Sequence, residues 1–326
     1  MLQSAEYFLA GLFGLQWPQN ATLEVIIEQD GFNNSLAGYD NCPGSNLPAS
    51  EGGTNATTQW ASIYLANATS RINSQIQGLN FTVSDVYNMQ SLCAYETVAL
   101  GYSAFCDLFT YEEWQGYEYS VDINFAGNDA FQSPTGRAVG IGWAQELIAR
   151  MTHHFVTSPA GTQVNTTLDS MPETFPTNQV LNFDFSHDTN IMSDLTALGL
   201  TQFAPFLPAD HMVSHDLIVS HLEPFGARVD IEVIDTPHPI KADDCLAYEE
   251  DQGPTQYVHF VINQRTLPLG RSYPQCGNLQ NGWCEMSAFL NATSTIIQDA
   301  QFEYACFGNY SAVPYGTLNN GVPQPQ

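Results

Sequence analysis

The residues with the clearest chemical potential are Ser186, His187 and Asp188, which place an imidazole beside a carboxylic acid. Such side chains commonly donate and accept protons in enzymes, so the pair could form an acid–base site. Alternating apolar residues over 180–185 predict a half-buried strand before the pair, and the apolar residues of 195–200 predict a helix after it. The pair would then lie at the C-terminal end of a strand, where α/β sheets usually bind ligands. The alternative is that this His-Asp dipeptide is an ordinary solvated loop.

Three other patterns resemble functional motifs, and we interpret each of them as a structural feature. A second Ser-His-Asp, at residues 214–216, precedes an apolar run instead of following one, so we place the site at His187 and Asp188. Neither triplet predicts a serine hydrolase, because consecutive side chains cannot form the relay that three separated residues build. The glycines of 136–142 lack the Gly-x-Gly-x-x-Gly spacing of a nucleotide loop and indicate close helix packing. The adjacent histidines 153 and 154 are expected at a helix C-terminus and not on a metal ion.

The charge balance argues against whole classes of partner. The chain of 326 residues carries 34 Asp and Glu against seven Lys and Arg, for a formal net charge of −27 and a pI near 4.1. Nucleic acids and anionic membranes require basic residues, so neither is an expected partner. No apolar stretch approaches the ~20 residues of a membrane span. The net negative charge decreases in acid, because carboxyls are protonated near their ordinary pKa of about 4. The composition therefore suits an acidic medium, and it also favours solubility.

Sequons and cysteines indicate a secreted protein. Eight Asn-x-Ser/Thr sequons begin at Asn20, Asn33, Asn55, Asn67, Asn80, Asn165, Asn291 and Asn309. Seven cysteines without Cys-x-x-Cys spacing favour disulfides in an oxidising compartment over a zinc site. Because seven is odd, one thiol is free or pairs with a cysteine outside this chain. Residues 1–6 lack the basic start of a signal peptide, so we expect that an N-terminal part has been lost.

The order of predicted elements is that of an α/β protein with a helical insertion. Helical spacing is found at 1–13, 58–104 and 138–152, and strand patterns are found at 22–27, 180–185, 227–234 and 257–262. The stretch 82–85 resembles a helix-capping start. We therefore expect a first part of the α/β core at 1–50, a mainly α-helical cap subdomain at 51–170 and a second part of the core at 171–326.

Four blocks of sequence resemble the fungal branch of the histidine acid phosphatases, the phytases and broad-specificity acid phosphatases. The blocks are residues 109–119, residues 133–138 with Gly142 and Trp143, residues 185–188, and residues 224–228. The resemblance covers nearly the whole chain. It implies the fold that the element order predicts, an α/β core like that of phosphoglycerate mutases with a small α-helical domain that caps the site.

The resemblance also implies hydrolysis of phosphomonoesters through a phosphohistidine, with no cofactor and no metal ion. In the family, a histidine of an Arg-His-Gly-x-Arg-x-Pro motif attacks phosphorus, while the His-Asp motif holds the phosphate and protonates the leaving alcohol. On this basis we assign His187 as a phosphate ligand and Asp188 as the general acid. The Arg-His-Gly-x-Arg-x-Pro motif does not occur in these 326 residues. We therefore expect the nucleophile and the phosphate-binding arginines in a segment that precedes this chain.

The chain is accordingly expected to be the larger C-terminal portion of a phosphatase, with the N-terminal segment or a small chain of the same protein as its partner. Family-like spacing implies the pairs Cys276–Cys284, Cys93–Cys106 and Cys42–Cys306, which leaves Cys245 to reach a cysteine of that segment. One lysine and six arginines suit the densely anionic phytate poorly, which favours a broad acid phosphatase with some phytase activity. The rival hypothesis is a noncatalytic secreted glycoprotein that retains the fold and binds carbohydrate or a surface.

Overall fold

The computed structural model describes residues 1–242 and 244–323, and the side chain of Cys245 lies outside the described residues. Its helices are α1 (Leu2–Phe13), α2 (Gly52–Tyr64), α3 (Ala66–Ser74), α4 (Val83–Leu100), α5 (Tyr111–Asn128), α6 (Gly136–Met151), α7 (Thr166–Asp169), α8 (Asp188–Ala197), α9 (Val219–Leu222), α10 (Met286–Ala292), α11 (Ile296–Asp299) and α12 (Phe302–Phe307). Its strands are β1 (Val229–Thr236), β2 (Ile240–Lys241), β3 (Asp244–Tyr248), β4 (Thr255–Ile262), β5 (Arg265–Leu267) and β6 (Cys284–Glu285). Every described helix is too short or too polar to cross a lipid bilayer.

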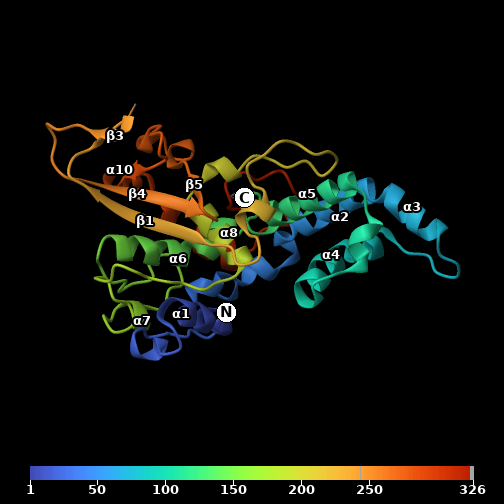
Figure 1. Ribbon diagram of the computed structural model, residues 1–326, viewed down its shortest axis with the longest axis horizontal. Helices are drawn as coiled ribbons and strands as arrows, with labels where there is room; N and C mark the ends of the chain where they lie inside the picture. Colours follow the sequence, from blue (N-terminus) through green and yellow to red (C-terminus); the bar gives the residue numbers. More distant parts are fainter. Residues whose placement is uncertain (243, 324–326) are drawn as a thin grey trace.

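The molecule is elongated, with a sheet at one end and a helical region at the other (Figure 1). Strand β4 pairs antiparallel with β1, β5 and β6, and β2 pairs with β3 in a separate two-stranded ribbon. The strands predicted at 227–234 and 257–262 are confirmed as β1 and β4. The main core joins Ile141 of α6 and Met192 of α8 to Phe260 of β4 and Phe289 of α10, so these two helices are packed into the body that carries the sheet.

The helical region consists of α2 to α5 and has a small core of its own. Residues Ala61, Leu65, Ala68, Ile72, Val86 and Phe109 form that core. The capping pattern predicted at 82–85 is confirmed, since Thr82 and Asp85 each bond the other's backbone at the start of α4. The boundaries at 50 and 170 that we expect for a cap subdomain stay a prediction.

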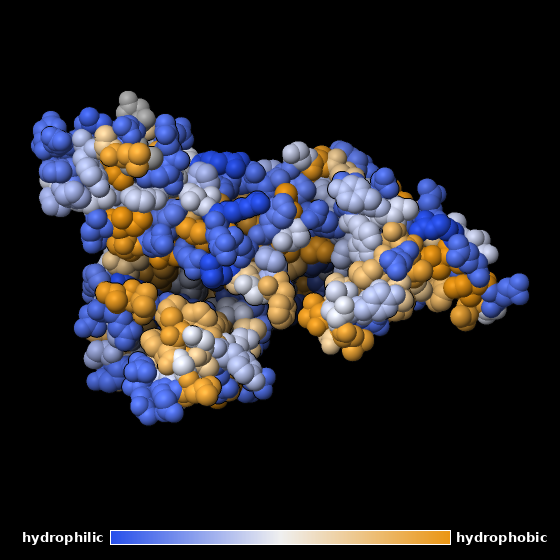
Figure 2. Space-filling view, in the orientation of Figure 1, coloured by the Kyte–Doolittle hydropathy of each residue, from blue (hydrophilic) through white to orange (hydrophobic). Residues whose placement is uncertain are grey.

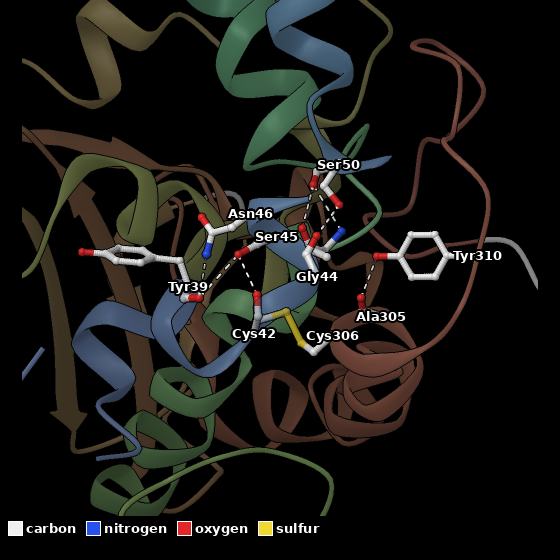
Figure 3. Close-up of a disulfide and its surroundings, with 11 residues drawn as sticks. Tyr39, Cys42, Gly44, Ser45, Asn46, Ser50, Ala305, Cys306 and Tyr310 are labelled. Carbon is white, nitrogen blue, oxygen red and sulfur yellow. Dashed lines mark hydrogen bonds between the residues drawn. A yellow bond between two sulfur atoms is a disulfide. The ribbon is translucent and has the colours of Figure 1, made fainter. Parts of the chain in front are cut away.

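Three disulfides join segments that are distant in sequence. The pairs Cys42–Cys306, Cys93–Cys106 and Cys276–Cys284 are those that the family resemblance implies. The first spans 264 residues and ties the 3₁₀ segment η2 (Ser35–Asn41) and the turn after it to α12, as Figure 3 shows. A Cβ on Gly44 would meet the carbonyl oxygen of Ala305 at 2.5 Å, so the two backbones approach closely beside this bond.

The strands predicted at 22–27 and 180–185 are wrong for the structure described. Neither segment has regular secondary structure, and neither belongs to a β-ladder among the described residues. A strand requires hydrogen bonds from a neighbour, and the alternating apolar pattern alone cannot supply them. Their apolar side chains are correspondingly exposed: Val180 is 95% exposed, and Val25 and Leu181 are each 61% exposed.

Glycines in α6 let it approach its neighbours closely, as the sequence predicts. A Cβ at Gly140 would lie 2.3 Å from the carbonyl carbon of Ser193 in α8, and a Cβ at Gly136 would lie 2.2 Å from the carbonyl oxygen of Ala130. Ser193 Oγ in turn donates to the carbonyl of Asp129 at 3.0 Å. Helix α8 is therefore placed against α6 and the end of α5.

We expect Gly140→Ala to separate α6 from α8 and to lower the free energy of unfolding by about 1–3 kcal/mol, the usual cost of overpacking. Gly142→Ala is the matched control on the same helix, because its Cβ would meet nothing closer than 3.5 Å. The control should be neutral or stabilising by up to ~1 kcal/mol, since alanine favours a helix over glycine. Urea unfolding of both variants measures the difference, and equal effects would contradict the close contact.

Candidate active site

His187 and Asp188 lie at the start of helix α8. His187 is the N-cap residue with extended backbone angles, and its carbonyl accepts from the N–H of Ile191 at 3.0 Å. Asp188 is the first helical residue, and its Oδ1 accepts from the N–H of Thr189 at 2.8 Å. A helix N-terminus presents free N–H groups and a partial positive charge, which favours an anion such as phosphate.

The surroundings of His187 come from the N-terminal part of the chain. Its Nε2 lies 2.9 Å from Oε1 of Glu28, and its ring meets that of Tyr39 edge-on, with centroids 5.8 Å apart. The preceding Ser186 donates to the carbonyl of Leu36 at 2.6 Å. The side chain of His187 is 29% exposed, so it remains accessible to a ligand.

Tyr39 is on η2, the segment that precedes the Cys42–Cys306 disulfide (Figure 3). Burial, with the negative charges of Glu28, Asp40 and Asp188, raises the pKa of Tyr39 to about 12, so it stays a neutral phenol beside His187. The disulfide and the hydroxyl bond from Ser186 thus hold this wall of the site in place.

Two buried carboxyls lie near Asp188. Burial, followed by the charge of Asp188, raises the pKa of Asp129 to about 8. Burial and the charges of Asp188 and Asp129 raise the pKa of Glu223 to about 9, and both carboxyl oxygens of Glu223 are buried without a partner among the described residues. These two groups are therefore neutral acids at acidic pH.

A second group of carboxyls surrounds Arg150, and we call these five residues the Arg150 cluster: Arg150, Glu146, Asp169, Asp184 and Glu24. Arg150 Nη1 contacts Asp184 Oδ2 at 2.7 Å. Ser35 Oγ donates to Glu146 Oε2 at 2.7 Å, and Glu146 also bonds Asp169. No N–H or hydroxyl group among the described residues donates to the buried Asp169 Oδ2, and a proton shared with Glu146 would satisfy it.

Burial sets the proton affinity of this pair. It raises the pKa of Asp169 to about 6, although the bond from Glu146 and the charge of Arg150 act against it. It also raises the pKa of Glu146 well above its ordinary value, and the charge of Asp169 adds to that effect. The folded state therefore holds protons that the unfolded chain releases, so stability falls as the pH rises through this range.

We expect the contribution of this pair to the free energy of unfolding to be greatest below about pH 4, the ordinary pKa of a carboxyl, and to decrease by roughly 1–3 kcal/mol toward pH 8. Glu146→Gln imitates the protonated acid, since its amide donates to Asp169 and its oxygen accepts from Ser35. This variant should match the wild type at pH 5 and exceed it at pH 8 in urea unfolding. Glu250→Gln, at an exposed position, is the control and should change neither value. A wild-type stability that rises with pH would contradict the assignment.

The histidine and aspartate of the second Ser-His-Asp, at residues 214–216, make structural contacts. His215 is nearly buried, with Nδ1 2.8 Å from the carbonyl of Val213 and Nε2 2.9 Å from Oδ2 of Asp122 in α5. Asp216 pairs with Arg271 at the surface. Both ring nitrogens of His215 are therefore engaged in packing the 213–219 segment against α5.

The histidines that follow α6 also make local bonds. His153 Nδ1 contacts the carbonyl of Thr177, and His154 Nδ1 lies 2.6 Å from the hydroxyl of Thr152. Within the described residues, no group of three or more His, Cys, Asp or Glu side chains is placed to hold a metal ion.

Sequence reasoning missed Glu28, Tyr39, Arg150 and Glu223, which surround or support the His-Asp pair. One signal was present for Arg150, because the chain has only six arginines and this one falls on a helix with a predicted core face. The others carry no local signal, since their neighbours in space are far away in sequence.

The His-Asp pair thus lies at a helix N-terminus, in a mixed fold of helices and antiparallel strands. Residues 1–263 match the family model of the histidine phosphatase superfamily (branch 2), and the chain belongs to that family. Over 281 residues it is 32% identical to a Phytase A of Aspergillus terreus, covering 83% of this chain and 55% of that protein. It is 28% identical over 329 residues to an acid phosphatase of Schizosaccharomyces pombe, covering 96% of this chain and 62% of that protein.

A solved structure shares the fold of this chain. The structure aligns with the crystal structure of the phytase from D. castellii with a TM-score of 0.71 and 24% sequence identity, covering 98% of this chain and 62% of that one. The chain therefore spans a little more than half the length of the relatives that it matches.

Proposed function

We propose that this chain is the larger part of a secreted acid phosphatase, which hydrolyses phosphomonoesters through a phosphohistidine. The observation that carries the proposal is the placement of His187 and Asp188 at the N-terminus of α8 in a member of the histidine phosphatase superfamily. The helix N-terminus and His187 would hold the phosphate, and Asp188 would protonate the leaving alcohol.

The nucleophile would come from a segment outside these 326 residues, because the chain contains no Arg-His-Gly-x-Arg-x-Pro motif. The segments 22–27 and 180–185 support this proposal, since both lack a strand partner among the described residues and expose apolar side chains. An added strand would satisfy their backbones and cover those side chains. Figure 2 shows an open notch between α1 and α4 in which further chain could lie.

Asp188→Asn should separate substrates by leaving group. An alkyl phosphate such as glycerol phosphate needs the proton, so its kcat should fall by roughly 10²–10⁴-fold. p-Nitrophenyl phosphate has an activated leaving group and should lose less than about 10-fold. His187→Ala is the companion variant, which should impair both substrates alike through weaker phosphate stabilisation. Equal losses for both substrates in Asp188→Asn would mean that Asp188 is not the proton donor.

Cys245 provides a test of the missing segment. With the other six cysteines paired, we propose that it forms a disulfide with a cysteine outside this chain. Peptide mapping of the mature protein without reduction should find Cys245 joined to such a peptide, and mass analysis should find Arg-His-Gly-x-Arg-x-Pro in the same polypeptide or in a companion chain. A single chain of this sequence with a free Cys245 would instead favour the noncatalytic glycoprotein.

Secretion and substrate range are parts of the same proposal. Six of the eight sequon asparagines are exposed, namely Asn20, Asn55, Asn67, Asn80, Asn291 and Asn309, and three disulfides are formed. Around the His-Asp pair the ionisable neighbours are Glu28, Asp40, Asp129 and Glu223, all of them carboxylic acids that offer no positive charge to a phosphate. Such surroundings favour simple phosphomonoesters over the more highly charged phytate unless the missing segment supplies cations.

A further inference from the structure

Arg150 connects helix α6 to the segment that leads into the His-Asp pair. Its Nη1 contacts Asp184 Oδ2 at 2.7 Å, and Trp143 Nε1 of the same helix donates to that oxygen at 3.1 Å. The guanidinium lies over the ring of Phe175, 4.9 Å from its centroid. Asp184 is three residues before His187, so this contact restrains the segment that leads into the His-Asp pair.

The segment 180–185 depends on such side-chain contacts. It has no ladder among the described strands, and its other close packing is between the rings of Phe183 and Phe185 and the ring of Phe8 in α1, at 4.9 and 5.5 Å. An extended segment without backbone partners is free to shift unless its side chains are bound. The pair that Asp184 forms with Arg150 is the charged contact that binds it to α6.

The same helix also holds the residues after the pair. Gly140 of α6 meets the backbone of Ser193 in α8, and α8 begins at Asp188. Helix α6 therefore contacts the chain on both sides of Ser186, His187 and Asp188. The position of the pair follows from where α6 places Gly140 and Arg150.

Arg150 faces carboxyls from several elements. They are Glu146 on α6, Asp169 at the end of α7, Asp184 before the site and Glu24 in the 22–27 segment. Burial alone would lower the pKa of Arg150, but the charges of Asp184, Glu146 and Asp169 raise it, so it stays cationic. Glu146 and Asp169 share a proton at acidic pH and therefore carry less negative charge. The ion-pair partner of Arg150 is then Asp184.

We propose that Arg150 is a positioning residue of the phosphatase site: by binding Asp184 it fixes the segment 180–185 and thereby aligns His187 and Asp188 with the bound phosphate. The catalytic part of this inference depends on the function proposed above. The structural part, that Arg150 orders the approach to the pair, does not.

The test uses the enzyme together with its nucleophile segment and the variants Arg150→Met, Asp184→Asn and the double variant. Misalignment of catalytic groups should lower kcat on p-nitrophenyl phosphate by roughly 10–100-fold in each single variant. The double variant should be no worse than the poorer single variant, because both changes remove one interaction. Arg150→Lys, which keeps the charge, should recover part of the loss. Additive losses would overturn the proposal.

Hydrogen exchange provides a readout that is independent of activity. The amide of Ile191, which donates to the carbonyl of His187, should exchange at least about 10-fold faster in both single variants, while those of β1 and β4 stay as in the wild type. Arg271→Met is the matched control, since it removes another Arg–Asp pair at an exposed site. Unchanged exchange at Ile191, or an equal change in the control, would overturn the proposal.

The two readouts distinguish this inference from the proposed function. An inactive wild type with faster exchange in Arg150→Met and Asp184→Asn would refute the phosphatase and retain the positioning role. An active wild type whose variants keep full kcat and unchanged exchange would retain the phosphatase and refute the positioning role. Should Arg150→Met fail to fold, Asp184→Asn decides the matter, because its amide still accepts from Trp143.

Discussion

Helix α8 can lie where it does because α6 presents Gly140 to the backbone of Ser193. That contact fixes the direction in which α8 points and therefore where its first residue, Asp188, stands. The same helix carries Arg150, which contacts Asp184 before the His-Asp pair, and Glu146, which accepts from Ser35. The geometry of the candidate site is thus largely a property of α6, although no atom of the His-Asp pair belongs to it.

Proton binding takes the place of ion pairing in much of this interior. A chain with 34 acidic and seven basic residues cannot pair all of its carboxyls with cations. The structure instead buries acids whose pKa values are raised, namely Asp129, Glu146, Asp169, Asp194 and Glu223. Each of them favours the folded state in acid. The composition and the interior thus agree on an acidic environment.

Membership in the histidine phosphatase superfamily accounts for the fold. The relatives are longer than this chain, and their additional length bears on the apolar side chains that this chain exposes. The segments 22–27 and 180–185 have strand-like sequences but no strand partner in the part of the chain that the structure describes. Their apolar side chains lie at the surface near α1 and α6, where burial by additional chain would stabilise them at about 25 cal/mol per Å². In our proposal, the segment that brings the nucleophile also completes this layer.

The sequence by itself determined the helices with clear caps and periodicity, the strands β1 and β4, and the reason for the glycines of α6. Through the family resemblance it also led to the three disulfides and to His187 and Asp188 as candidates. Only the tertiary structure decided that 22–27 and 180–185 lack ladders, because a ladder requires a neighbour that local pattern cannot reveal. It likewise brought Glu28, Tyr39 and Arg150 to the site. His187 and Glu28 are 159 positions apart, and Arg150 and Asp184 are 34 apart. Such contacts depend on how helices pack, and packing is a property of the whole chain.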